Sequence, residues 1–164
     1  MNAMNAHTLM PPVIPRHPSS SNDRWLASFP LRSFLELGAY DQAPGSARGH
    51  SRNVLAEWRL AAFEEKVTLI VSELVTNAVA ATAKVAWQAG LPPVRLWLLA
   101  GTDGVLVAMW DAVAEIPPQP RRAGDLAEAG RGLWIVREFS ARCDCYLPPA
   151  PPGGKVIRAL VATP

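Results

Sequence analysis

The sequence lacks the features that mark membrane and secreted proteins. None of its apolar runs approaches the roughly 20 residues that a bilayer-spanning helix needs. Its start shows no basic segment followed by an apolar stretch, so we expect no secretory signal and a cytoplasmic location. The chain has only two cysteines, Cys143 and Cys145, whose spacing would strain a disulfide, and we expect both to be reduced.

Clustered charge is scarce as well. The formal net charge is only +2, and the basic residues are scattered along the chain. Proteins that bind nucleic acid need a basic face, so we expect no direct contact with nucleic acid, and none with a membrane.

Hydrophobic residues make up 49% of the chain, which is enough for a core, and 164 residues suit one domain with a tail. Residues 1–23 mix Asn, Met, Pro, Ser and His without a periodic pattern, so we expect a flexible N-terminal tail there. Residues 24–164 are expected to form the single domain.

Hydrophobic periodicity predicts the order of the structural elements. These are a strand within residues 25–37, helices at 46–60 and 63–87, strands at 94–100 and 105–110 joined by a hairpin turn, a helix at 133–140, and strands at 143–147 and 156–161. The order predicts an α+β fold, a two-layer sandwich with helices on one face of a mixed, mostly antiparallel sheet. Residues 112–129 form a long loop, and loops of this length are usually functional or mobile.

The second predicted helix carries a carboxylate and an amide one turn apart. Glu73 can accept a proton, and the amide oxygen of Asn77 can ligate a hard cation such as Mg²⁺. Lys66 and Lys84 fall on the same stripe of the helix, so a solvated helix face is an open alternative.

Three further positions could carry chemistry. Asp111 follows an apolar strand, where it could cap a loop or accept a hydrogen bond from an exocyclic amine such as N6 of adenine. Gly130, Arg131 and Gly132 precede a predicted helix, and the free amides at the start of a helix favour phosphate binding. A simple turn before the helix is an open alternative. Lys155 follows two glycines and could lie in a simple hairpin turn or support a phosphate.

Taken in order, these segments resemble the histidine-kinase-like ATPases, which share the Bergerat ATP-binding fold. Residues 72–78, Ser-Glu-Leu-Val-Thr-Asn-Ala, are similar to the first conserved box of that family, Asp111 to the second, and residues 128–133 to the glycine-rich third. The resemblance spans about residues 29–161 and is closest to the small single-domain branch of anti-sigma-factor serine kinases.

The resemblance implies a role for each motif. Asn77 would hold Mg²⁺ on ATP, Glu73 would orient or deprotonate the attacking hydroxyl or water, and Asp111 would recognise adenine. Gly130, Arg131 and Gly132, with Leu133 closing the motif, would wrap the phosphates, residues 112–129 would form a lid, and Lys155 would support a phosphate or that lid. Val156 stands where the family usually has a threonine that helps to bind adenine.

Two functions follow most directly from the resemblance, ahead of a third, a simple ATP hydrolase, for which a lone domain lacks the extra modules that close on nucleotide. The first is an ATP-dependent protein serine kinase that phosphorylates an antagonist protein and also binds a sigma factor. The second is an ATP-binding regulator that sequesters its partner without phosphotransfer. Glu73 favours the first, whereas the apolar residues after Asp111 favour the second. Relatives often form homodimers, and a homodimer is expected as one option here.

Overall fold

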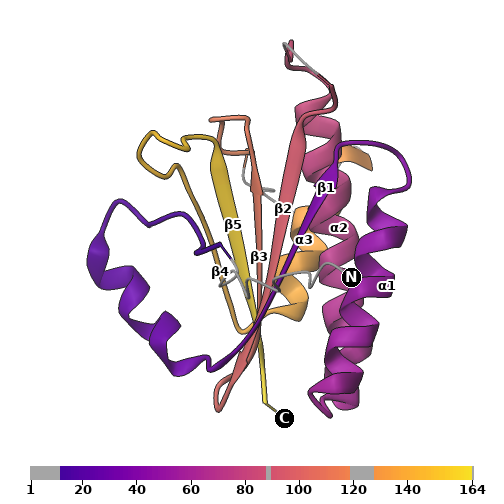
Figure 1. The fold of residues 1–164 in the computed structure, drawn as a ribbon, viewed down its shortest axis with the longest axis vertical. Helices are drawn as coiled ribbons and strands as arrows, with labels where there is room; N and C mark the ends of the chain where they lie inside the picture. Colours follow the sequence, from indigo (N-terminus) through magenta and orange to yellow (C-terminus); the bar gives the residue numbers. More distant parts are fainter. Residues whose placement is uncertain (1–11, 88–89, 119–127, 164) are drawn as a thin grey trace, which may run out of the picture.

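The computed structural model describes residues 12–87, 90–118 and 128–163 of the chain. Its elements run, in order, η1 (Ser20–Ser28), β1 (Leu31–Gly38), α1 (Ala43–Glu57), η2 (Ala61–Phe63), α2 (Glu64–Thr82), β2 (Pro93–Gly101), β3 (Gly104–Asp111), α3 (Glu128–Phe139), β4 (Arg142–Tyr146) and β5 (Lys155–Ala162) (Figure 1). The two η elements are short 3₁₀ segments.

The five strands form one sheet in the order β1-β2-β3-β5-β4. All four pairings between the described strands are antiparallel, where the sequence predicted a mixed, mostly antiparallel sheet. The predicted hairpin is confirmed, because β2 and β3 are neighbours and Gly101 pairs with Gly104 across the turn.

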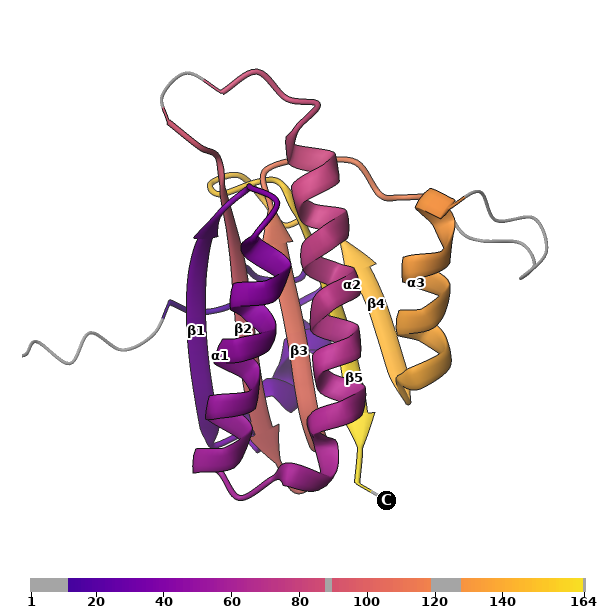
Figure 2. The same ribbon diagram turned by 90° about the vertical axis from the view of Figure 1, so that its right-hand side faces the viewer.

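Helices α1, α2 and α3 lie on one face of this sheet, which confirms the predicted two-layer α+β arrangement (Figure 2). Helix α2 buries the apolar stripe that its sequence predicted, since Val67, Val71, Leu74, Val75 and Ala78 are all buried. Alternate residues of the strands meet these helices, because successive side chains of a strand point to opposite faces.

The opposite face of the sheet is covered by residues 12–29. Ile14 and Phe29 are buried there against Trp97 and Trp110. Residues 1–23 carry no periodic pattern, so a flexible tail was expected there. In the structure residues 12–23 pack on the sheet, and residues 1–11 lie outside the described part.

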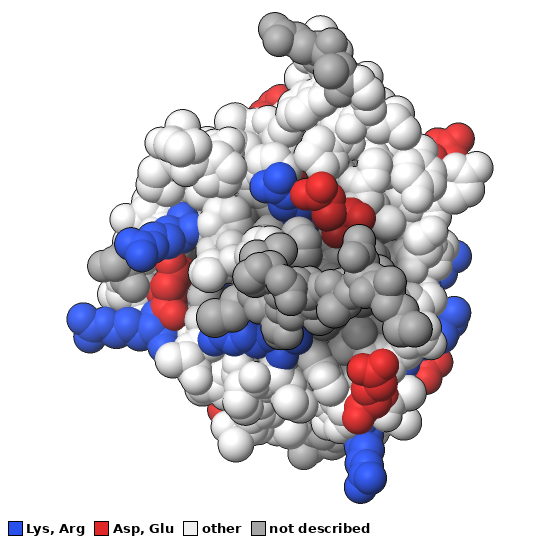
Figure 3. Space-filling model, viewed as in Figure 1, with Lys and Arg blue, Asp and Glu red and all other residues white. Residues whose placement is uncertain are grey.

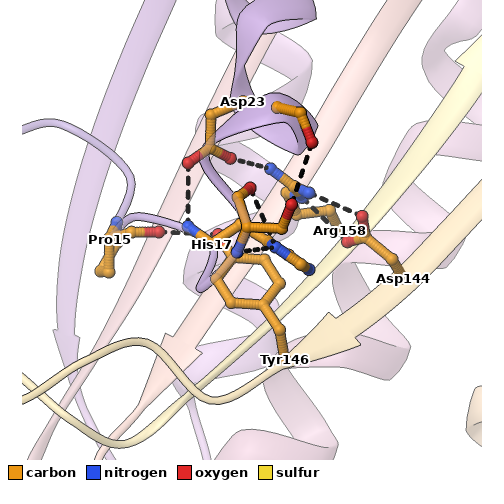
Figure 4. Close-up of polar contacts among 8 residues, drawn as sticks. Pro15, His17, Asp23, Asp144, Tyr146 and Arg158 are labelled. Atoms are coloured by element: carbon orange, nitrogen blue, oxygen red, sulfur yellow. Dashed lines mark hydrogen bonds and ion pairs between the residues drawn. The ribbon is translucent and has the colours of Figure 1, made fainter.

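A buried arginine holds this N-terminal segment to the sheet (Figure 4). Arg158 of β5 is only 1% exposed, and its guanidinium donates two hydrogen bonds to the Asp144 carboxylate, at 2.8 and 2.6 Å. It donates a third to Asp23 Oδ1, at 2.8 Å, and lies 4.7 Å from the centre of the Tyr146 ring. A buried charge needs such partners, so Asp23 and Asp144 together make the guanidinium tolerable in the core.

Several element boundaries differ from those predicted. Helix α1 begins and ends three residues before the predicted 46–60, and α2 ends at Thr82 rather than 87. The first strand begins only at Leu31, because residues 25–28 belong to η1. Helix α3 begins at Glu128, five residues before the predicted start at 133.

Among the described residues visible in Figure 3, Lys and Arg side chains are dispersed among Asp and Glu. This agrees with the scattered charge of the sequence. No helix within the described residues is long and apolar enough to cross a membrane.

Candidate functional site

Helix α3 lies against the face of α2 that carries Glu73 and Asn77. Gly132 is the point of closest approach. A Cβ added to Gly132 would lie 2.5 Å from Glu73 Oε2 and 3.4 Å from Asn77 Nδ2. Glu73 and Asn77 are half-buried, so they face a neighbouring helix, whereas Lys66 and Lys84 are exposed. The structure therefore brings three of the predicted site residues together.

The Asn77 amide is the unusual atom group of this cluster. Its Nδ2 is buried and has no hydrogen-bond partner among the described residues. Leaving a buried polar group unpaired costs about 1–3 kcal/mol, so native structures nearly always satisfy such groups. A ligand that binds between α2 and α3 would supply the missing partner, and rotation of the amide presents Oδ1 to the same space.

This donor set fits a magnesium nucleotide. Carboxylate and amide oxygens are the ligands that Mg²⁺ prefers in proteins, usually alongside water and phosphate oxygens. Asn77 can supply an amide oxygen, and Glu73 a carboxylate one turn away. The missing side chain at Gly132 lets the α3 backbone come close to both of these side chains.

The glycine motif does not precede α3 as expected but forms part of it. Because α3 begins at Glu128, Gly130, Arg131, Gly132 and Leu133 all lie inside the helix. Arg131 is exposed, and Leu133 packs against the core. Two glycines lower helix propensity, which is why the sequence favoured a later start. Of the predicted lid at 112–129, residues 119–127 lie outside the described part, and 128–129 are helical.

Asp111 and Lys155 form a buried ion pair at the end of the sheet. They face each other across the β3–β5 pairing, and the Lys155 ammonium lies 2.8 Å from Asp111 Oδ1 and 2.7 Å from Oδ2. The Val113 backbone N–H donates to Oδ1 at 2.9 Å. Asp111 is only 2% exposed and Lys155 only 4%. Both residues were predicted site residues, but their pairing was not predicted from the sequence.

Burial and the ion pair act on Asp111 in opposite directions. Burial raises the pKa of the Asp111 carboxyl, because the charged form loses its hydration. The hydrogen bond and charge of Lys155 lower that pKa, as does the Val113 N–H, so they oppose the effect of burial. Lys155 thus favours the ionised form of a carboxyl that could accept hydrogen bonds from a ligand.

Val156 does not line this site, which corrects the expectation that it replaces a threonine near adenine. It points to the opposite face of the sheet, where it is buried with Trp110 and Tyr146. The reason is the two-residue period of the strand, which places Lys155 on the helix side and Val156 on the other. Lys155 is therefore the β5 residue opposite Asp111.

A hollow lies between α3 and the strands β4 and β5, on the helix side of the sheet. Its lining residues are Pro117, Pro118, Leu133, Arg137, Cys143, Asp144, Cys145 and Ile157. We call it the α3 hollow. Its thiols are poor nucleophiles, since burial raises the pKa of Cys143 and raises that of Cys145 to about 11. Both cysteines are free, as expected from their spacing.

A comparison with protein families matches residues 40–160 to the histidine kinase-like ATPase domain. The match covers most of the chain. The chain belongs to this family. No curated protein matches the chain significantly. Membership implies that the ATPase domain binds ATP, and domains of this family generally bind it with Mg²⁺.

Proposed function

We propose that this ATPase domain is a protein serine kinase of the anti-sigma-factor type, which transfers the γ-phosphoryl group of ATP to a serine of an antagonist protein and binds a sigma factor. Such partners place it in the cytoplasm. The observation that carries the proposal is the buried Asn77 amide, which lacks a hydrogen-bond partner among the described residues and lies beside Glu73 under Gly132. The similarity of residues 72–78 to that branch supports it.

Each residue of the cluster has a task in this proposal. Asn77 contributes its amide oxygen to Mg²⁺, and Glu73 accepts the proton that leaves the serine hydroxyl. Asp111 accepts a hydrogen bond from the exocyclic amine of adenine. The first turns of α3, from Gly130 to Leu133, line the phosphates. Mg²⁺, when bound, offsets the negative charge of the phosphates during transfer.

The second candidate is a regulator that binds ATP and captures a partner without phosphotransfer. One observation favours it. Lys155 already contacts both carboxylate oxygens of Asp111, so Asp111 has less capacity left to bind adenine. A lower affinity for ATP and a slower turnover would suit a binding module better than an enzyme.

Calorimetry with Mg-ATP tests the nucleotide site on which both candidates depend. The wild type should give saturable heat, and Asn77→Ala should bind more weakly because it removes a metal ligand. Thr76→Ala is the matched control, since Thr76 is the exposed neighbour on the same helix, and it should bind as the wild type does. If the wild type gives no saturable heat at millimolar ATP, the proposal is wrong. Labelled ATP with candidate antagonist proteins then separates kinase from regulator.

A further inference from the structure

Lys155 is paired with Asp111, the proposed adenine-binding residue, but has no task of its own in the proposed site. We propose that Lys155 reads the base directly, by donating a hydrogen bond to N1 of adenine while Asp111 accepts one from the 6-amino group. The inference rests on the proposed nucleotide site and goes beyond it, because it assigns a specificity-determining residue. It makes the ligand class a purine with a 6-amino group and an unprotonated N1.

The hydrogen bonds of the pair leave one acceptor and one donor for a ligand. Asp111 Oδ1 accepts from both Lys155 and the Val113 N–H, whereas among the described residues only Lys155 contacts Oδ2. An anionic carboxylate oxygen can accept at least two bonds, so Oδ2 has room for another. The ammonium has three hydrogens. Besides the two carboxylate oxygens it reaches the Val113 carbonyl at 3.4 Å, a long and weak contact.

Adenine presents the matching pair of groups. Its 6-amino group donates and the adjacent N1 accepts, so the carboxylate and the ammonium can each engage one of them. A ligand nitrogen can replace the long Val113 contact at little cost, since that contact is the weakest of the three. A 6-oxopurine has the reverse pattern, with an acceptor at position 6 and a donor at N1. Its oxygen would face the Asp111 carboxylate, and its N1–H would face the Lys155 ammonium.

The buried pair lies beside the α3 hollow. Lys155 and Ile157 are two residues apart on β5, so their side chains share the helix-facing side of the sheet. Ile157, Cys145 and Leu133 line the α3 hollow. Cys145 pairs with Ile157 across β4 and β5, and Asp111 pairs with Lys155 across β3 and β5, so the ion pair lies next to this lining on the same face. A base that binds at the edge of the hollow nearest Lys155 would have its polar edge toward the pair, which is buried beside the lining.

The first test needs only the wild type and three nucleotides, ATP, 1-deaza-ATP and ITP, measured by calorimetry with Mg²⁺. Since 1-deaza-ATP replaces N1 by a carbon, it should bind about 10-fold or more weakly, as expected for loss of a hydrogen bond to a charged donor. ITP should bind more weakly still, because its groups oppose the site at both positions. Equal affinity for ATP and 1-deaza-ATP would overturn the inference and leave the ATP site standing.

The second test removes the donor. Lys155→Met keeps an unbranched side chain of similar length, and it should bind ATP and 1-deaza-ATP equally, whereas the exposed control Lys84→Met should discriminate like the wild type. If Lys155→Met instead binds ATP more tightly than the wild type, Lys155 competes with the base and the inference is wrong. Since this variant leaves Asp111 buried and unpaired, Asp111→Asn/Lys155→Met is measured beside it, and it too should not distinguish ATP from 1-deaza-ATP. Absence of ATP binding by the wild type would refute the nucleotide site itself.

Discussion

Gly132 of α3 packs directly on the carboxylate of Glu73 in α2. A Cβ at this glycine would lie 2.5 Å from Glu73 Oε2, which is shorter than any ordinary contact between these atoms. The absence of a side chain at Gly132 therefore sets both the distance between the two helices and the position of the proposed base. The same absence brings the α3 backbone close to the Asn77 amide, whose two polar atoms would lie 3.4 and 3.6 Å from that Cβ.

Gly132→Ala should separate catalysis from stability. The new methyl group meets the far end of the flexible Glu73 side chain, so the carboxylate should move aside and the helices should stay together. Alanine also favours a helix by about 1 kcal/mol over glycine, so the melting temperature should stay or rise. Phosphotransfer should fall by about 100-fold, since a misplacement of about 1 Å has this effect.

The control for that variant is Gly49→Ala in α1, where an added Cβ meets no atom of the described residues within 4 Å. It should gain the same helix propensity and keep full activity. Unchanged phosphotransfer in Gly132→Ala would show that the position of Glu73 does not matter.

Glu73→Gln should spare binding and remove chemistry. A general base acts on a proton that leaves in the transition state, so its loss appears in the rate rather than in affinity. We expect phosphotransfer to fall about 10²- to 10⁴-fold, with ATP affinity little changed. A phosphotransfer assay beside a partner pull-down measures both. Equal phosphotransfer by wild type and variant would eliminate the catalytic role and favour the binding regulator.

The parts of the fold that depend on local pattern could be predicted from the sequence. The stripe of α2 and the turn between β2 and β3 repeat at the period of their own element, and both were found. The spacing of Glu73 and Asn77 is likewise a local feature, set by the period of a single helix. These features need no knowledge of what packs against them.

The parts that depend on distant segments could not be predicted. Lys155 meets Asp111 through the pairing of β3 with β5, and the register of strands so far apart in the chain cannot be counted from a turn. The early start of α3 depends on Gly132 fitting against Glu73, a contact that overrides low helix propensity. Ile14 becomes a core residue only because the second face of the sheet is available to it.

Gly154 and Gly153 offer a matched pair for the turn before β5. Both have positive φ, +71° and +64°, so alanine at either position should cost about 1–2 kcal/mol of unfolding free energy. At Gly154 the Cβ would also collide with the Asp111 carbonyl oxygen and lie 2.8 Å from Trp110 Nε1, whereas at Gly153 its nearest contact is 3.7 Å away. Urea unfolding should show a clearly larger loss for Gly154→Ala. An equal loss of unfolding free energy in both variants would mean that the turn shifts to accommodate the new methyl group and that Gly154 is not tightly packed against the Asp111 backbone.

Asp23→Asn should loosen residues 12–29 without unfolding the domain. Asp23 accepts hydrogen bonds from Arg158 and from the His17 backbone N–H, both at 2.8 Å, and the charged one is lost or weakened in the variant. Arg158 keeps its two bonds to Asp144, so the guanidinium stays partnered. Amides of residues 12–29 should exchange hydrogen faster, and those of β3 should not change. Asp103→Asn, at an exposed turn, is the control and should leave both unchanged.

The Cys145 thiol should resist alkylation at ordinary pH, because burial raises its pKa to about 11. A raised pKa keeps the protonated thiol, and the thiolate is the reactive form. At pH 8 about one molecule in a thousand would carry the thiolate, against about one in four for a free cysteine of pKa ~8.5. Iodoacetamide should therefore modify the folded domain at least about 100-fold more slowly than the urea-unfolded chain. The rate should rise about tenfold for each pH unit until the pH nears 11, where the thiol loses its proton. Mass spectrometry of the peptide that contains Cys145 follows the reaction, and fast modification of the folded domain at pH 8 would contradict a buried thiol in the α3 hollow.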